Sequence, residues 1–468
     1  MTSGAYALSS KSEDIVPSSA QDNSDTYSEG HAVSSPFRHD PQYETYKDLI
    51  ATPLRDFKVY DAFTLVDDWQ SFMSYHDAYI SGNWDDTRGQ ADWEIRNQGM
   101  DPNKCQVSLS NFTTEAAPDR WRNEYEKAAG KCLNILFGRF YDNPNTGITA
   151  LADILLHWDE GKVLKTMNAR QQDMPDNLVT DLTYAVMTTV GNFMAHYALY
   201  HNLYSFSDEQ HAKIEAMLTD FVRDYDYYAT FRQAGPYYEI LCDLAAPLGK
   251  VIEKGTNDHC GSFNSRIATG ATLYGLEFGN QLIYDFGVRK LEITLATIDE
   301  LGGYSAHMGR GMLALGYAIQ LVAPMEQLSY AFTKAFDFDL VKMKNHNGSS
   351  LEDYYLGLYR FAHDPVSFGD TYTLTDRRGG NFYEQIKIIR KRPKAYKNVW
   401  ESFDLIDFYI LGGSLAKKHF PKQAERYHLP GLEMRYAGCC INHSTQIMTS
   451  HVVGFNPYVL RDATGSWQ

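Results

Sequence analysis

The sequence is short of positive charge, of paired cysteine motifs and of long apolar runs. Its 43 Lys and Arg residues stand against 59 Asp and Glu, a formal net charge of −16. This balance argues against a general nucleic-acid or membrane-surface binder, because such proteins need broad basic surfaces. The six cysteines show no CxxC spacing and no paired histidine pattern, so we expect no metal site. No signal peptide and no run of about 18 apolar residues is visible.

Tyrosine and tryptophan are abundant, with 33 Tyr and 7 Trp in 468 residues. Such side chains can line sugar-binding clefts by stacking on pyranose rings, although helix packing explains most of them equally well. The sequons at Asn111, Asn347 and Asn442 would be glycan acceptors only in a eukaryotic secretory protein. The cysteines allow one or two disulfides. These features leave the cellular compartment open.

The first 45 residues differ in composition from the rest of the chain. They are rich in Ser, Asp, Glu and Gly and poor in aliphatic residues, so they cannot bury enough surface to offset their chain entropy. We expect a disordered tail or linker at 1–45. No clear linker follows, and we expect residues 46–468 to form a single domain.

Apolar residues recur at intervals of three and four from about residue 115 onward, which predicts helices. The predicted helices are 120–138, 146–168, 177–204, 208–230, 236–252, 262–283, 285–300 and 305–332. The short breaks between them imply antiparallel hairpins, and the lack of a fixed repeat disfavours a solenoid. We expect a mainly α fold, an α/α toroid or incomplete barrel of helical hairpins with its core at about 115–420. A small mixed C-terminal part should follow, with strands at 371–374, 382–389 and 446–453 and a helix at 400–418.

Arg310 and Tyr317 stand seven residues apart in one predicted helix. Seven residues make nearly two turns, so both side chains project from one face, about 10 Å apart at their backbones. Ala314, between them on that face, is small and leaves the space open. A cation beside a phenol favours the phenolate, which suits the pair to proton transfer. Surface and core packing can produce the same spacing.

A polar cluster of Asn257, Asp258 and His259 precedes the predicted helix that begins near Phe263. Because the N-terminus of a helix carries partial positive charge, these residues could bind an anionic group there. Asn and Asp are also common helix caps, so an N-cap beside a bystander histidine is the alternative interpretation.

Together the two segments resemble the alginate lyase family of helical-toroid polysaccharide lyases. In that family an Asn-His pair opens one inner helix, and a later helix carries Ala-Arg-Gly, Ala-Leu and a Tyr seven residues after the Arg. The match here is Gly-Arg-Gly-Met-Leu-Ala-Leu-Gly-Tyr at 309–317, preceded by Ile298, Asp299 and Gly302 at the family's spacing. Weaker similarity runs from about residue 140 to Pro365, roughly half the chain.

The resemblance implies β-elimination on an anionic uronic-acid polymer, with no cofactor. The C5 proton is removed, an enolate-like intermediate forms and the bond from C4 to the glycosidic oxygen breaks. Asn257, His259 and Arg310 would neutralise the C6 carboxylate, together with Asp258 if it is protonated. Tyr317 would protonate the leaving oxygen and, with mannuronate or glucuronate, could also remove the C5 proton. His259 is the alternative base, and the sequence does not choose between them.

The sequence departs from the family pattern at two important places. Asp258 stands where the family has its Asn, although Asn257 could take that place by a small register shift. Near the Arg310–Tyr317 pair, His307 replaces an acidic residue and Ala318 replaces a histidine. These changes leave the polymer open between alginate or polymannuronate and a related polyuronate such as glucuronan.

Four further residues are candidate substrate contacts. His307 lies one turn before Arg310 and is expected on the cleft face. Asn192 and His196 lie four apart on an otherwise apolar helix and could line the opposite wall, or be buried polar groups held by neighbouring helices. Trp158 could stack on a sugar or pack in the core.

Two other functions stay open. A glycoside hydrolase of the same architecture would use paired carboxylates, for which Asp258 with Asp299 or Glu300 are candidates. A non-catalytic polysaccharide-binding protein is the second alternative. The resemblance implies a secreted or periplasmic protein whose leader is absent from this chain, while a cytoplasmic location stays open. We expect a monomer or small homo-oligomer.

Overall fold

The computed structural model describes residues 52–60, 63–67, 96, 99–110, 132–166, 189–231, 262–296, 298–303, 325, 327–363, 375–376 and 380–381. The chain divides into two units, Met1–Val33 and Ser34–Gln468, and every described residue belongs to the second. The tail predicted at 1–45 therefore lies outside the described residues, as do the predicted helices 236–252 and 400–418.

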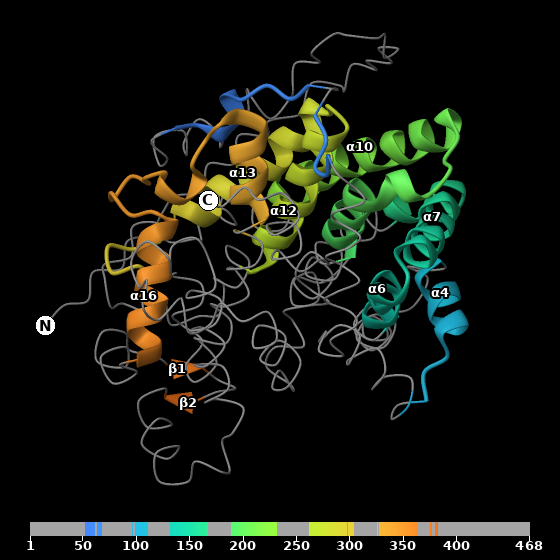
Figure 1. Cartoon of the computed structure of the whole chain (residues 1–468), viewed down its shortest axis with the longest axis horizontal. Coiled ribbons are helices and arrows are strands. Elements are labelled where there is room, and N and C mark those ends of the chain that lie inside the picture. Colours follow the sequence, from blue (N-terminus) through green and yellow to red (C-terminus); the bar gives the residue numbers. More distant parts are fainter. Residues whose placement is uncertain are drawn as a thin grey trace, which may run out of the picture. The chain divides into compact units, whose positions relative to one another are not determined.

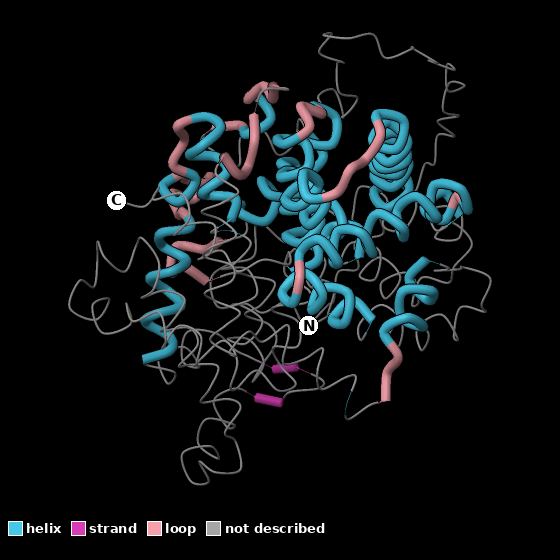
Figure 2. The backbone as a smooth tube through the Cα atoms, turned by 45° about the vertical axis from the view of Figure 1, so that its right-hand side comes forward, coloured by secondary structure: helices cyan, strands magenta, loops and turns pink. Residues whose placement is uncertain are grey.

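Helices dominate the described residues (Figures 1 and 2). The labelled elements are η3 (Leu54–Asp56), α4 (Pro102–Ser110), α6 (Cys132–Asp142), α7 (Pro144–Gly161), η5 (His201–Leu203), α10 (Asp208–Phe231), α12 (Ser262–Glu277), α13 (Gln281–Ala296), η8 (Leu340–Lys342), α16 (Leu351–His363), β1 (Thr375–Asp376) and β2 (Gly380–Asn381). Residues 189–200 and 327–336 are also helical. The prediction of a mainly α fold is confirmed.

Three helices, α4, α6 and α7, pack against one another. The Asn143 side chain caps α7 by accepting hydrogen bonds from the amides of Asn145 and Thr146, which lets α7 begin directly after α6. A disulfide between Cys105 and Cys132 joins α4 to the start of α6. Helices α6 and α7 are separated by Asn143 alone and pack directly against each other.

Helices α12 and α13 form a second, closely packed hairpin (Figure 1). Its break lies at 278–280, whereas the sequence predicted a break near residue 284, so that predicted boundary is wrong. Gly279 has φ +63°, a conformation that ends a helix readily. Asn280 then starts α13, because its side-chain oxygen accepts a hydrogen bond from the Ile283 amide. The apolar pattern continues through the break, so hydrophobic periodicity alone does not locate it.

Residues 52–60 and 63–67, which hold only the short turn η3, lie along the hairpin, and we call them the strap. Side chains of the hairpin bind the strap backbone at both ends: Glu292 accepts from the Leu54 amide at 2.6 Å and Glu277 from the Leu65 amide at 2.5 Å. Between them, Phe57 stacks on Phe336 with ring centroids 4.5 Å apart. The strap therefore relies on side chains to satisfy backbone groups that no α-helix or sheet pairs.

The described part of the C-terminal region holds two short strands. β1 and β2 pair antiparallel, with Thr375 opposite Asn381 and Asp376 opposite Gly380. The strands predicted at 371–374, 382–389 and 446–453 all lie outside the described residues. The mixed C-terminal part thus remains a prediction beyond this hairpin.

Candidate functional site

The residues predicted for the catalytic centre lie outside the described residues. They are Asn257, Asp258, His259, His307, Arg310 and Tyr317. The described chain resumes at Ser262, three residues after the polar cluster, and it stops at Gly303, seven residues before Arg310. The structure therefore shows the places at which both segments join the fold.

Both segments join the same end of the α12–α13 hairpin. A Cβ at Gly275 would lie 2.5 Å from the Tyr284 amide nitrogen, and one at Gly287 would lie 2.5 Å from that of Thr272. These two approaches fix one antiparallel register, which brings Ser262 level with the end of α13. The chain thus enters α12 from the cluster at 257–259 and leaves α13 toward Arg310 at one end of the hairpin.

A tight turn, Ile298–Gly303, leads from α13 toward the Arg310 segment. Asp299 organises it: one carboxylate oxygen accepts hydrogen bonds from the amides of Leu301 at 2.9 Å and Gly303 at 2.7 Å. The Asp299 amide also donates to the Gly303 carbonyl at 2.8 Å. This carboxylate holds the turn, which weakens its candidacy as one of a pair of hydrolytic acids. Glu300, the other hydrolase candidate, is exposed.

Gly302 owes its place in this turn to geometry. Its φ is +75°, where a side chain is strained, and a Cβ there would lie 2.0 Å from the Asp353 carbonyl oxygen of α16. Only glycine lets the turn pass this close to the helix. The family-like spacing of Gly302 therefore has a structural explanation that does not involve substrate.

Asn192 and His196 lie on the helical segment 189–200 and are fully buried. The His196 ring stacks on Phe137 with centroids 4.1 Å apart, and its Nδ1 lies 2.8 Å from the Asn192 carbonyl oxygen. A residue that lines a substrate cleft must be exposed to it, and neither of these side chains is exposed. Their surroundings are those of buried polar groups between helices.

Trp158 on α7 is also fully buried. Its indole N–H donates to the Leu109 carbonyl of α4 at 2.7 Å, and its ring lies 5.1 Å from that of Phe193. A sugar ring has no access to either face in this structure. The contacts match the core-packing interpretation of Trp158.

Two buried carboxylates that sequence analysis did not select have shifted pKa values. Burial raises the pKa of Glu277 and that of Glu292 to about 7. Groups of this kind often mark active sites. Here both accept hydrogen bonds from strap amides, so they attach the strap. In the sequence, each is an acidic residue on an otherwise apolar helix face. This pattern does not distinguish a carboxylate that binds backbone amides from a catalytic acid.

A second polar cluster surrounds His201. Its Nε2 lies 3.8 Å from Glu277 Oε1, a distance that would permit an ion pair. Burial, however, lowers the pKa of His201 to about 4, so the ring is neutral at pH 7 and the contact is not an ion pair there. Nearby, the Tyr197 hydroxyl lies 2.6 Å from His211 Nδ1, and burial raises the tyrosine pKa. These groups are held in their neutral forms.

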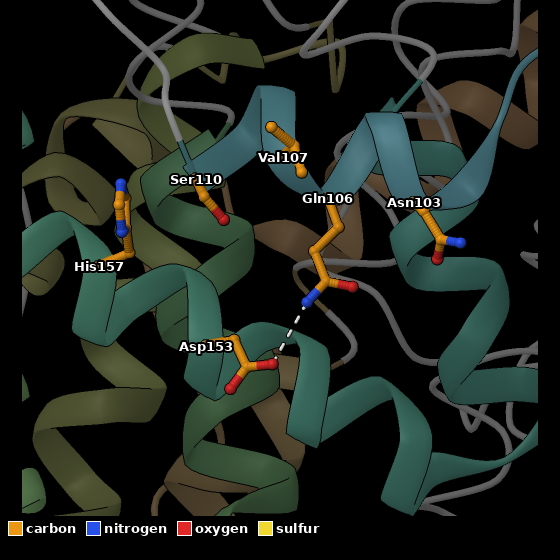
Figure 3. Close-up of a pocket in the computed structure, with 6 residues that line it drawn as sticks. All are labelled: Asn103, Gln106, Val107, Ser110, Asp153 and His157. Carbon is orange, nitrogen blue, oxygen red and sulfur yellow. Dashed lines mark hydrogen bonds between the residues drawn. The ribbon is translucent and has the colours of Figure 1, made fainter.

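A surface pocket of about 430 Å³ lies between α4 and α7 (Figure 3). It is lined by Asn103, Gln106, Val107, Ser110, Asp153 and His157. Gln106 points across the pocket and donates to Asp153 at 3.3 Å, while Arg139 donates to the Gln106 oxygen at 2.7 Å. The side chains of Gln106 and Asp153 are thus hydrogen-bonded within the protein.

The described residues contain no group of three or more His, Cys, Asp or Glu side chains arranged to hold a metal ion. None of the helices within the described ranges is long and apolar enough to cross a bilayer.

No family model and no curated protein matches the chain. Among solved structures it is similar to those of alginate lyase A1-III, an enzyme of Sphingomonas species A1. A Tyr-to-Phe variant complexed with tetrasaccharide has 13% identity and a TM-score of 0.44, over 86% of this chain and 99% of that one. A His-to-Ala variant complexed with tetrasaccharide has 15% identity and a TM-score of 0.43, over 70% and 85%. The apo form of that variant has 13% identity and a TM-score of 0.38, and the match spans 56% of this chain and only 63% of that one.

These structures are alginate lyases, the family that the sequence motifs resemble. A likeness this distant assigns neither an activity nor a substrate to the chain.

Proposed function

We propose that the chain is a polysaccharide lyase that cleaves a uronic-acid polymer by β-elimination. The observation that carries the proposal is the seven-residue spacing of Arg310 and Tyr317 within the motif at 309–317. The hairpin register supports it, because the segments carrying His259 and Arg310 join the fold at one end of α12 and α13. The proposed substrate is alginate or polymannuronate, or a related polyuronate such as glucuronan.

The reaction makes three demands on the site. A base takes the C5 proton, the electron pair forms a C4=C5 double bond as the C4–O bond breaks, and an acid protonates the departing oxygen. In the proposal Arg310, His259 and Asn257 neutralise the C6 carboxylate, which makes C5 more acidic. No water is consumed, and the product carries a double bond conjugated to its carboxylate.

Tyr317 is the proposed acid. With mannuronate the C5 hydrogen and the C4 oxygen lie on one side of the ring, so Tyr317 can serve as base as well. With guluronate they lie on opposite sides, and His259 is then the proposed base. A polymer preference measured with each uronate would therefore separate the two schemes.

The test is ultraviolet absorbance of the unsaturated product during incubation with polymannuronate, polyguluronate, mixed alginate and glucuronan. We expect absorbance to rise with at least one polymer and Tyr317→Phe to reduce the rate at least about 100-fold, the usual contribution of a general acid or base. Tyr284→Phe is the matched control, since its hydroxyl donates to the Leu54 carbonyl of the strap. No absorbance with any polymer would refute the lyase, and an active Tyr317→Phe would remove that residue from the mechanism.

Asp258 can be tested separately. If its place requires a neutral group beside the substrate carboxylate, Asp258→Asn should raise the rate, because an ionised Asp repels that carboxylate. A lower rate would instead show that the acid itself takes part.

We propose an oxidising compartment, secreted or periplasmic. The Cys105–Cys132 disulfide supports it, because disulfides are rare in reducing cytosol. Mass spectrometry of the protein purified under thiol-blocking conditions would test this: alkylation of both cysteines before any reductant is added would contradict it.

A further inference from the structure

The loop that precedes α16 grips the turn at the end of α13. Asn345 is its centre and is only 6% exposed. Its side-chain amide donates to the Leu295 carbonyl at 3.0 Å and to the Ile298 carbonyl at 2.8 Å. Its side-chain oxygen accepts from the amides of Asn347 at 3.2 Å and Ser349 at 2.9 Å. Every hydrogen-bonding position of this amide group is therefore filled.

Two neighbours extend the grip. Asn347 donates from its side chain to the Ile298 carbonyl at 2.9 Å, and Ser349 donates from its hydroxyl to the Asp299 carbonyl at 2.8 Å. We call Asn345, Asn347 and Ser349 the amide clamp. It contacts three backbone carbonyls: those of Ile298 and Asp299 in the turn, and that of Leu295 in the last turn of α13, where carbonyls have no intrahelical partner.

The clamp is anchored to α16. Ser350 and Asp353 form a capping box at its start: the Ser350 amide donates to the Asp353 carboxylate at 2.9 Å, and the Asp353 amide to the Ser350 hydroxyl at 3.4 Å. Lys344 adds a 2.8 Å ion pair to Asp353. The turn, the clamp and α16 therefore form one continuous hydrogen-bonded unit.

We propose that Asn345 is a positioning residue for β-elimination. By fixing the end of α13 and the turn at 298–303, it holds the point from which the sequence runs on to Arg310 and Tyr317. This inference rests on the proposed function. Its physical basis is that the buried side-chain amide of Asn345 already has all its hydrogen bonds and has no other partner within reach. The turn that it binds is therefore confined to one conformation.

The magnitude follows from the sensitivity of catalysis to geometry. A displacement of about 1 Å at a reacting group can cost about 100-fold in rate, even when the substitution lies away from the chemistry. A looser turn would affect the placement of the reacting groups in the transition state more than the binding of a long polymer through many contacts. The rate should fall while the Michaelis constant changes little.

The clamp also gives another meaning to one sequon. In Asn347-Gly348-Ser349, the Asn347 amide nitrogen and the Ser349 hydroxyl both donate to the turn at the end of α13. The Asn-Gly-Ser pattern therefore has a folding role here that needs no glycan. Gly348, between them, has φ +84°, which the tight loop requires.

The test variant is Asn345→Asp in the full chain. It keeps the shape of the side chain but puts an oxygen where the amide donated to two carbonyls, so the turn loses two hydrogen bonds and gains repulsion. Hydrogen exchange by mass spectrometry should become at least about tenfold faster in peptides covering 295–303, since these amides exchange by local opening. In the absorbance assay the turnover number should fall about 100-fold with the Michaelis constant within about twofold.

Two further variants make the result decisive. Ser349→Ala removes one clamp hydrogen bond and should give the same pattern at smaller size, which covers the case in which Asn345→Asp fails to fold. Asn143→Ala removes the α7 cap, so it controls for general destabilisation and should leave turnover per folded molecule unchanged.

Unchanged exchange at 295–303 in a folded clamp variant would overturn the clamp. Faster exchange with unchanged turnover would overturn the positioning role. If the clamp variants exchange faster but the wild-type protein shows no elimination with any polymer, the proposed function is overturned, and with it the catalytic role of the clamp.

Discussion

The strap and the amide clamp attach irregular chain to the same hairpin by different chemistry. The strap is bound through buried carboxylates, Glu277 and Glu292, which accept hydrogen bonds from its amides. The clamp works through neutral side chains, with Asn345 at its centre. Both satisfy backbone groups that lack a helical partner. Only the strap is held by groups that titrate near neutral pH.

The difference predicts which attachment depends on pH. A carboxylate whose folded pKa is raised contributes stability that is fully present below its unfolded pKa of 4.5 and is lost as pH rises through about 7. The clamp amides carry no charge at any pH in this range. Attachment of the strap should weaken from about pH 5 to pH 8, while the clamp should be unaffected.

The largest expected effect comes from Gly302→Ala, which disrupts the turn that the clamp holds. The new Cβ would meet the Asp353 carbonyl oxygen at 2.0 Å and would sit on a backbone with φ +75°. We expect the free energy of unfolding to fall by about 4 kcal/mol, from overpacking and backbone strain together. Urea unfolding measures it.

Gly348→Ala is the control for that experiment. Gly348 also has a positive φ, +84°, but no atom lies within 4 Å of the point that a Cβ would occupy there. It should lose only the conformational term, about 1 kcal/mol. Equal losses in the two variants would show that the close approach to α16 contributes nothing.

Glu292→Gln sharpens the pH contrast. A pKa rise from 4.5 to about 7 corresponds to about 3 kcal/mol. The variant is neutral at every pH, so its unfolding free energy relative to wild type should rise by about this amount between pH 5 and pH 8. Arg55 favours the carboxylate and Asp56 opposes it, and both stay in place. Urea unfolding at the two pH values measures the change, and a constant difference between the proteins would contradict a raised pKa.

Asp67→Asn should have the smallest effect. Asp67 pairs with Lys334 at 2.8 Å at the end of the strap, but its side chain is 67% exposed. Such a pair contributes about 0.5 kcal/mol, and salt screens it. Lys334 keeps its hydrogen bonds to the Thr64 and Leu65 carbonyls. Thermal unfolding measures the effect. A fall of more than about 2 kcal/mol in the free energy of unfolding would show that the strap depends on its exposed ion pair and not on the buried carboxylates.

The sequence predicted helices better than their ends. The helix predicted at 208–230 is α10 almost residue for residue, because its start is marked by Ser207-Asp208-Glu209 and its apolar period is clear. The break in the α12–α13 hairpin was misplaced by several residues, since the apolar run continues through it. A turn made by one glycine in the left-handed region leaves little trace in hydrophobic periodicity.

The candidate site shows a similar division. Asn192, His196 and Trp158 were ambiguous in the sequence, and their complete burial gives them the contacts of core residues. Burial depends on which helices pack over a face, and local spacing does not contain that information. The roles of Arg310, Tyr317, His259, Asn257, Asp258 and His307 stay predictions, because these residues lie outside the described part of the chain.

The sequence by itself determined the helical class, the acidic balance and the spacing of the Arg310–Tyr317 pair, since each depends on residue type and periodicity alone. Only the tertiary structure revealed the Glu277 and Glu292 attachments of the strap and the amide clamp on the α13 turn. These contacts join residues from about 50 to more than 200 positions apart. Their partners are backbone groups, which every residue carries, so no side-chain pattern along the chain identifies them.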